Sequence, residues 1–171
     1  DFIDNRKIVL LGHSRGGGIA IVHTASDVRI RALVTWSSVA TFDRWTNHQK
    51  ELWRKTGYLP LAKDMSVSPL RLGIDLLHDL ESHQERLNIS QAATKINIPW
   101  LIIHGKADIP VPCKEGETLY AISQKTTTRL VLLDHVGHLY NARSPDEDNF
   151  ETLNHILTLT TDWLKQKLSK E

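Results

Sequence analysis

The sequence is poor in the features that would tie it to a membrane, to nucleic acid or to an oxidising compartment. It has one cysteine, Cys113, which leaves no second thiol for a disulfide within the chain. It has no apolar run that approaches the roughly 18 residues of a transmembrane helix. Its 21 basic and 20 acidic residues are interspersed and give a formal net charge of +1. Without a basic block, neither nucleic acid nor an anionic membrane surface is the expected partner.

Motifs for metals and nucleotides are also missing. No His-Glu-x-x-His run occurs, and no Gly-x-Gly-x-x-Gly follows an apolar run. We therefore expect neither a metal nor a cofactor. What is present is the composition of a soluble globular protein, with 40% hydrophobic and 24% charged residues. The length of 171 residues suits one domain with a sizeable core.

The most informative motif is the pentapeptide Gly12-His13-Ser14-Arg15-Gly16. It follows an apolar run and precedes a stretch of small residues that suits a helix. A Gly-x-Ser-x-Gly sequence at such a junction holds the serine on a sharp, strained turn and exposes its hydroxyl group above the sheet. The flanking glycines lack a Cβ, so the strand and the helix can approach each other closely. Ser14 is therefore a candidate nucleophile, and the alternative is a serine that only caps the helix.

Strand and helix patterns alternate along most of the chain. Continuous apolar runs predict buried strands, and amphipathic or small-residue stretches predict helices between them. The predicted strands are 7–11, 31–36, 97–104 and 128–134, and the predicted helices are 15–26, 114–124 and 147–168. Because strands alternate with helices, we expect an α/β fold with a mostly parallel sheet.

Residues 39–95 interrupt this alternation, and the stretch is too long for a plain crossover between two strands. We predict that it is a cap-like insertion in a single domain that spans residues 1–171. It contains a helical pattern after Pro69 and four aromatic residues, Phe42, Trp45, Trp53 and Tyr58. These four are candidates for the lining of an acyl or aryl pocket, and the alternative is that they form the core of the insertion itself.

A nucleophilic serine needs a base, and the base needs a group that orients it. His138 follows the last predicted strand, and Asp108 follows the strand before it. Since ligands of open α/β sheets gather at the carboxyl ends of the strands, both side chains are expected near Ser14. The rival acid is Asp134 and the rival base is His135, which lie in the same segment as His138. We interpret His13 and His104 as structural neighbours of the serine turn and of the third strand.

Three segments resemble the catalytic segments of α/β-hydrolase esterases and serine peptidases. They are Gly-His-Ser-Arg-Gly-Gly at 12–17, Ile-Pro-Trp-Leu-Ile-Ile-His-Gly-Lys-Ala-Asp-Ile-Pro-Val-Pro at 98–112, and Val-Gly-His at 136–138. The chain is most similar to dienelactone-hydrolase-like and prolyl-oligopeptidase-like enzymes, and the resemblance runs from Lys7 to the terminal helix. It implies that Ser14 is the nucleophile, Asp108 the acid and His138 the base. It also implies that the backbone N–H of Arg15 is one oxyanion donor.

The chain departs from that family in its length. The family's sheet normally has eight strands, and the strands expected here resemble the fifth to the eighth. The loop after the family's third strand supplies the second oxyanion N–H, and no counterpart is present. We therefore expect the chain to be the C-terminal part of a longer protein, whose N-terminal segment completes the sheet beside residues 7–11.

The resemblance implies a serine hydrolase that cleaves carboxylic esters through a Ser-His-Asp triad and an acyl-enzyme. One alternative is an amide or peptide hydrolase with the same triad, because the triad does not choose the bond. Another is a catalytically incomplete hydrolase fragment that keeps the scaffold. The expected partner is a small-molecule ester or amide, and the expected location is the cytoplasm.

Overall fold

The computed structural model of the chain describes residue 4 and residues 6–61, 70–142 and 150–169. The chain divides into two compact units. The first, which we call the sheet unit, comprises Asp1–Thr41 and Ile89–Glu171. The second, which we call the inserted unit, comprises Phe42–Asn88. Among the described residues, no helix combines the length and the apolar character that crossing a bilayer requires.

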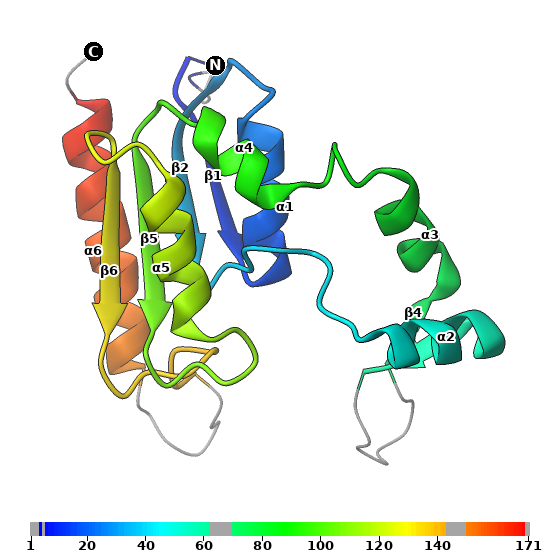
Figure 1. The fold of residues 1–171 in the computed structure, drawn as a ribbon. Coiled ribbons are helices and arrows are strands. Elements are labelled where there is room, and N and C mark those ends of the chain that lie inside the picture. Colours follow the sequence, from blue (N-terminus) through cyan, green and yellow to red (C-terminus); the bar gives the residue numbers. More distant parts are fainter. Residues whose placement is uncertain (1–3, 5, 62–69, 143–149, 170–171) are drawn as a thin grey trace. The chain divides into compact units, whose positions relative to one another are not determined.

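The sheet unit is built on a four-stranded parallel sheet with the order β1-β2-β5-β6 (Figure 1). Its elements in chain order are β1 (Ile8–His13), α1 (Arg15–Thr24), β2 (Ile30–Trp36), α4 (Ile89–Lys95), β5 (Trp100–Gly105), α5 (Cys113–Ile122), β6 (Thr128–Leu133) and α6 (Glu151–Leu168). Because all four strands run in the same direction, the segments that follow β1, β5 and β6 all leave the sheet at the carboxyl ends of the strands. The expected α/β fold with a parallel sheet is confirmed.

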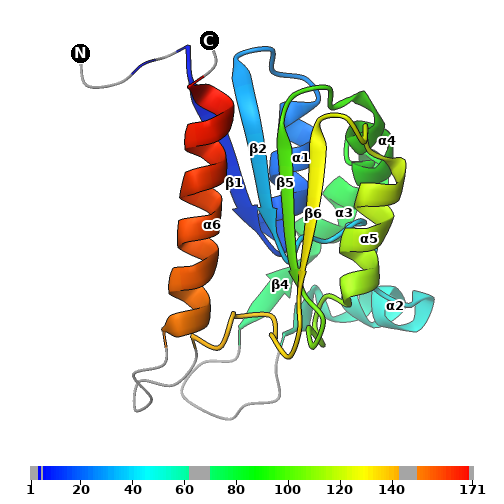
Figure 2. The same cartoon turned by 90° about the vertical axis from the view of Figure 1, so that its left-hand side faces the viewer.

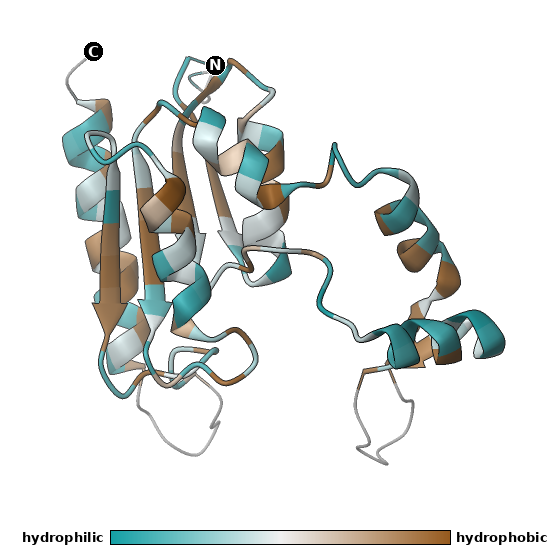
Figure 3. Cartoon of the chain, viewed as in Figure 1, coloured by the Kyte–Doolittle hydropathy of each residue, from teal (hydrophilic) through white to brown (hydrophobic). Residues whose placement is uncertain are grey.

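Helices cover both faces of this sheet. α6 lies on one face, and α1, α4 and α5 lie on the other (Figure 2). Successive side chains of a strand point to opposite faces, so each inner strand contributes to two layers of core. Ala32, Val34, Leu101 and Ile103 pack with Ile156 and Trp163 of α6. In Figure 3 the hydrophobic colour runs along β6 and much of β5, as expected for strands covered on both sides.

β1 differs from the inner strands. All six residues of β5 are buried, whereas Gly12 is the one buried residue of β1 and Leu11 is 49% exposed. Among the described strands, β1 pairs with β2 alone and forms one end of the sheet order. An apolar strand at the edge of a sheet leaves backbone groups open to pairing with a further strand.

The inserted unit has a small core of its own. It comprises α2 (Asn47–Thr56), β3 (Tyr58–Pro60), β4 (Arg71–Gly73) and α3 (Ile74–Ser82), and β3 pairs with β4 in antiparallel fashion. Thr46 caps α2 with its side-chain oxygen, and Gly57 ends the helix in the left-handed conformation. Trp53, Leu59 and Leu77 form the buried cluster.

The two points where the chain leaves and re-enters the sheet unit lie close together. The Ser90 hydroxyl group donates to the carbonyl group of Ala40 at 3.5 Å. The backbone N–H of Ala40 donates to the Glu115 carboxylate of α5 at 2.8 Å. The inserted unit therefore interrupts the sheet unit between two residues that are neighbours in space.

The helical pattern predicted after Pro69 is confirmed as α3, which begins at Ile74; residues 71–73 before it form β4, because they pair with β3. The third predicted strand begins at Trp100 and not at 97, since Pro99 has no N–H to give to a ladder. Pro69 and the predicted helical residues 147–149 lie outside the described residues.

Candidate active site

Ser14 occupies the tight turn between β1 and α1. Its backbone angles are φ 57° and ψ −124°, a conformation that residues other than glycine rarely adopt. The turn is held on both sides: the Ser14 N–H donates to the Trp36 carbonyl group of β2 at 2.9 Å, and the Ser14 carbonyl group accepts from Gly17 N–H at 3.1 Å. Its side chain makes no capping hydrogen bond. Ser14 therefore does not make the side-chain hydrogen bond that would define it as a helix cap.

Two glycines allow α1 to pack closely against its surroundings, Gly12 against β1 and Gly17 against the loop after β2. A Cβ on Gly12 would lie 2.3 Å from the carbonyl oxygen of Gly16, and a Cβ on Gly17 would lie 2.5 Å from the Ser38 Oγ. A Cβ on Gly16 would meet no atom within 4 Å. The steric role expected for Gly16 is therefore wrong: Gly12 lets β1 approach α1, and Gly17 lets α1 approach Ser38 in the loop after β2.

His138 lies between Ser14 and Asp108. Its Nδ1 is 2.8 Å from Asp108 Oδ2, and its Nε2 is 3.0 Å from Ser14 Oγ. A carboxylate can only accept, so Nδ1 carries the hydrogen, and the Nε2 of a neutral ring accepts from the serine hydroxyl group. Both distances fall within the range of about 2.6–3.2 Å expected for a nucleophile, its base and the group that orients the base.

Asp108 is held from its own loop and from β5. Its side chain is completely buried, and its Oδ1 accepts from the backbone N–H of Val111 at 2.9 Å. His104, the buried histidine of β5, donates from Nε2 to the carbonyl group of Val111 at 2.8 Å and lies 3.4 Å from Asp108 Oδ2. Val111 thus connects the strand to the carboxylate through both of its backbone polar groups.

The segment that carries His138 is tied to the sheet by Tyr140. The Tyr140 hydroxyl group donates to the carbonyl group of Ile103 at 3.3 Å, and the Ser37 hydroxyl group lies 3.0 Å away and can donate to it in turn. Burial raises the pKa of the Tyr140 hydroxyl group, so it stays protonated. Tyr140 and Ser37 both have positive φ angles, of 54° and 46°. The hydrogen bonds hold two strained turns against each other.

His13 contacts the back of the same segment. Its Nε2 lies 2.9 Å from the backbone carbonyl group of His138, which can only accept, so Nε2–H donates. The two rings lie 4.7 Å apart between centroids. Burial lowers the pKa of His13, which favours the neutral ring. His13 therefore supports the backbone of His138.

The rival candidates lie elsewhere. Asp134 is exposed and pairs with Lys106 at 2.7 Å, an interaction that lowers the pKa of its carboxyl group. His135 is exposed and sits at a positive φ of 60° in the turn after β6. The geometry therefore brings Ser14, Asp108 and His138 together and places the two rivals on the surface. Arg15 is the first residue of α1, where its backbone N–H lies at the positive end of the helix.

The aromatic residues proposed for a substrate pocket belong to the inserted unit. Trp53 is fully buried in its core and packs against Trp45 with ring centroids 5.0 Å apart, while Tyr58 is 36% exposed. This packing accords with the alternative reading of Trp45 and Trp53 as core residues. A role for Phe42, Trp45, Trp53 and Tyr58 in substrate binding stays a prediction.

Sequence reasoning missed Val111, Ser37 and Tyr140. Val111 acts through its backbone, which no residue type reveals. Ser37 and Tyr140 are more than a hundred positions apart in the sequence, and neither lies in a motif.

Within the described part of the chain, no group of three His, Cys, Asp or Glu side chains is arranged to hold a metal ion.

Comparisons with known proteins give one curated relative and many solved structures. No protein-family model matches the sequence. The curated relative is the uncharacterized protein YfhR of Escherichia coli O157:H7, which is 26% identical over 160 residues, and the match covers 91% of this chain. The chain spans about half the length of that relative, since the match covers 47% of it.

The solved structures with a similar fold include an esterase, a lipase and a peptidase. The monoacylglycerol lipase of Paleococcus ferrophilus matches with a TM-score of 0.70 and 18% identity, over 95% of this chain and 69% of the lipase. The acylaminoacyl peptidase of Pyrococcus horikoshii matches with a TM-score of 0.64 and 14% identity, over 98% of this chain and 25% of the peptidase. At this level of identity the likeness is one of fold. The chain therefore shares the α/β-hydrolase fold of these structures.

Proposed function

We propose that the protein is a serine hydrolase that cleaves carboxylic esters, with Ser14 as nucleophile, His138 as base and Asp108 as the acid that orients the base. One observation carries the proposal, the continuous hydrogen-bonded chain from Ser14 Oγ through the His138 ring to Asp108 Oδ2. A serine hydroxyl group is a poor nucleophile at its ordinary pKa, and a base within hydrogen-bond reach activates it.

In the acylation step, the Ser14 hydroxyl group gives its proton to His138 Nε2 while Oγ forms a bond to the carbonyl carbon. The electron pair of the carbonyl bond moves to its oxygen. When the carbonyl bond re-forms, the bond to the leaving oxygen breaks, and that oxygen takes the proton from Nε2. A water molecule then gives a proton to Nε2 while its oxygen bonds to the acyl carbon; the bond to Ser14 Oγ breaks, Oγ takes the proton from Nε2, and the acid is released. Asp108 holds the ring in the required tautomer and stabilises its charged form.

The oxygen that becomes negative needs hydrogen-bond donors in fixed positions. The backbone N–H of Arg15 is the donor we assign, because it lies at the start of α1 directly after the nucleophile. A second donor from a segment beyond this chain remains part of the proposal. Removing one such donor costs about 10²- to 10³-fold in rate.

β1 is the outermost described strand on its side of the sheet, and apolar side chains near it are exposed. Among the described strands it pairs with β2 alone, Leu11 is 49% exposed and Ile19 of α1 is 58% exposed. We propose that further strands of the same protein pair with β1 and supply the second donor. A longer natural chain that contains this sequence should then react with a fluorophosphonate about 10²- to 10³-fold faster than the 171 residues alone. Equal rates would contradict this part of the proposal.

Hydrolysis of an amide or peptide bond is the second candidate. The acylaminoacyl peptidase has a similar fold, and one scaffold can carry both ester and amide hydrolysis. The triad acts alike on the two bonds, so the substrate pocket makes the choice. A comparison of kcat/KM for an aryl acetate and an aminoacyl anilide distinguishes them.

The test of the proposed function is covalent labelling. A fluorophosphonate reacts with an activated serine, and the intact mass reports one adduct. We expect one adduct on the protein, no adduct on Ser14→Ala, and one adduct on the control Ser26→Ala, which removes an exposed serine hydroxyl group after α1. An adduct that persists in Ser14→Ala would assign the reaction to another residue. No adduct on either this chain or a longer one would leave a scaffold without serine chemistry.

A further inference from the structure

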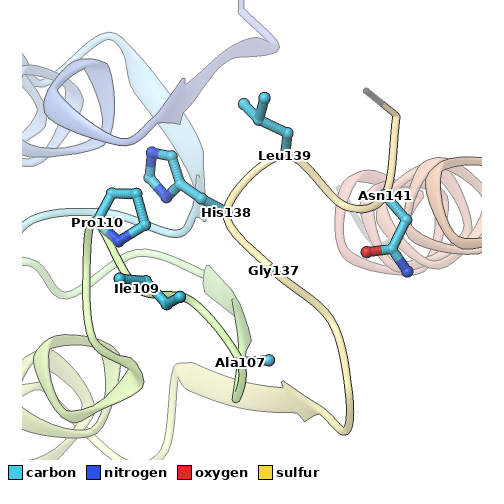
Figure 4. Close-up of a pocket in the computed structure, with 7 residues that line it drawn as sticks. All are labelled: Ala107, Ile109, Pro110, Gly137, His138, Leu139 and Asn141. Atoms are coloured by element: carbon cyan, nitrogen blue, oxygen red, sulfur yellow. The ribbon is translucent and has the colours of Figure 1, made fainter. Parts of the chain in front are cut away.

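A cavity of about 360 Å³ lies on the sheet unit between the segment that carries Asp108 and the segment that carries His138 (Figure 4). From the first segment it is lined by Ala107, Ile109 and Pro110, and from the second by Gly137, His138, Leu139 and Asn141. It is within the range of about 300–1,000 Å³ typical of small-molecule sites. Its lining brings together residues on both sides of the candidate acid and base.

The lining is apolar apart from two side chains. Ile109 is 88% exposed and Leu139 is 41% exposed, although both are large hydrophobic residues. A single exposed hydrophobic residue is common on a protein surface and has no special meaning. Two that line one cavity beside a candidate catalytic histidine are the arrangement expected of a ligand site. The polar residues of the lining are His138 and Asn141.

The chemistry of the proposed reaction assigns the two ends of an ester to different sides of the site. The proton taken from Ser14 passes from His138 Nε2 to the leaving oxygen, so that oxygen must come within about 2.6–3.2 Å of Nε2. The carbonyl oxygen must instead face the start of α1, where the backbone N–H groups lie. The carbon chain attached to the leaving oxygen therefore extends on the side of His138.

From this geometry we infer that the cavity binds the alkyl group of the leaving alcohol, and that Ile109 and Leu139 give the enzyme a preference for esters of apolar alcohols. The inference rests on the proposed function. Among the described residues that line it, Asn141 and His138 are the polar ones, and none is a lysine or arginine that would pair with a phosphorylated or carboxylated alcohol. The class of substrate is thus an ester of an uncharged alcohol with a short to medium alkyl chain.

The test uses two series of substrates on the whole protein. In the first, the acyl group stays acetyl and the alcohol grows from methyl to ethyl to butyl. In the second, the alcohol stays methyl and the acyl group grows from acetyl to butyryl. A buried methylene is worth about fourfold in binding, and this cavity is partly open, so kcat/KM should rise about two- to fourfold with each methylene of the alcohol.

The variants Ile109→Ser and Leu139→Ser should flatten the rise in the alcohol series and leave the acyl series unchanged. Both side chains are exposed enough that the fold should tolerate the change. The matched control is Val28→Ser, which removes a residue that is 91% exposed in the turn before β2, at the opposite ends of the strands. The control should keep both series as they are.

Two results would overturn the inference. In the first, kcat/KM still rises with the length of the alcohol in both cavity variants. In the second, the variants abolish the rise with the length of the acyl group, which would make the cavity an acyl site. Labelling of Ser14 by a fluorophosphonate reads the proposed function separately. Labelling without any preference among the alcohols refutes the cavity assignment alone, whereas absence of labelling refutes both.

Discussion

The contact between Ser37 and Tyr140 gives the sharpest prediction about stability. The Ser37 side chain is buried, and its hydroxyl group lies 3.0 Å from the Tyr140 hydroxyl group, which also donates to the carbonyl group of Ile103. In Tyr140→Phe the Ser37 hydroxyl group stays buried and loses this partner, and such a group costs about 1–3 kcal/mol. In Ser37→Ala the Tyr140 hydroxyl group keeps Ile103, so the cost is about 0.5–1.5 kcal/mol.

The double variant decides whether this reasoning is right. Once Tyr140→Phe has been made, the Ser37 hydroxyl group has already lost its interaction, and removing it also removes a buried unpaired group. The Ile103 carbonyl group still accepts from the backbone N–H of Ser37 at 2.8 Å. We therefore expect the double variant to lose less free energy of unfolding than the two single variants combined, by about 0.5–1.5 kcal/mol.

The assay is urea unfolding followed by tryptophan fluorescence and circular dichroism. With a slope m of about 2 kcal/mol/M, Tyr140→Phe should lower the midpoint by about 0.5–1.5 M at unchanged slope. The control Tyr58→Phe, which changes an exposed tyrosine of the inserted unit, should leave the midpoint in place. Additive losses within about 0.3 kcal/mol, or a loss below about 0.5 kcal/mol in Tyr140→Phe, would refute the coupling.

Three further predictions concern the serine turn and its partners. Asp108→Asn should keep the fold and lower kcat about 10⁴-fold, because an amide at this position favours the wrong tautomer of the ring; an unchanged kcat would contradict the acid role. Gly17→Ala should lower the free energy of unfolding by about 1–3 kcal/mol, since its Cβ would lie 2.5 Å from Ser38 Oγ, whereas Gly16→Ala meets no atom within 4 Å and should be neutral or stabilising; equal effects in urea unfolding would refute the steric reading. His13 has a lowered pKa in the folded protein, so the unfolded chain binds the proton more readily and stability should fall as pH drops below about 6.5, by at most about 1.4 kcal/mol per pH unit. His13→Asn should flatten that slope in urea titrations from pH 7 to 5, and parallel slopes would count against it.

Much of the sheet unit could be predicted because its determinants are local. Continuous apolar runs are typical of parallel strands, and those that become β1, β2, β5 and β6 have predicted bounds within a few residues of the observed ones. In a parallel sheet, the residues that follow each strand lie at the same end of the sheet, so residues far apart in the sequence are expected to meet there. This is why Ser14, Asp108 and His138 could be named together before any distance was known.

The sequence does not predict contacts made by backbone groups or contacts between residues that are far apart in the chain. The orienting contact of Val111 involves only its N–H and carbonyl groups. The role of Gly17 depends on Ser38, which lies in the loop after the neighbouring strand. The strand at Arg71–Gly73 forms because Tyr58–Pro60 pairs with it, and a helical pattern in the surrounding residues conceals that pairing. Each of these features is decided by tertiary contact and not by local preference.

The neighbouring positions of Ala40 and Ser90 have a consequence for how such a protein can change over time. The sheet unit must close a loop between these two residues whatever the loop contains. The entropic cost of closure grows only by about 0.6 kcal/mol for each doubling of loop length. Residues 42–88 can therefore lengthen, shorten or be exchanged for another compact segment at little cost to the strands and to the hydrogen-bonded chain from Ser14 to Asp108. The inserted unit can therefore vary while the geometry of Ser14, His138 and Asp108 in the sheet unit is kept.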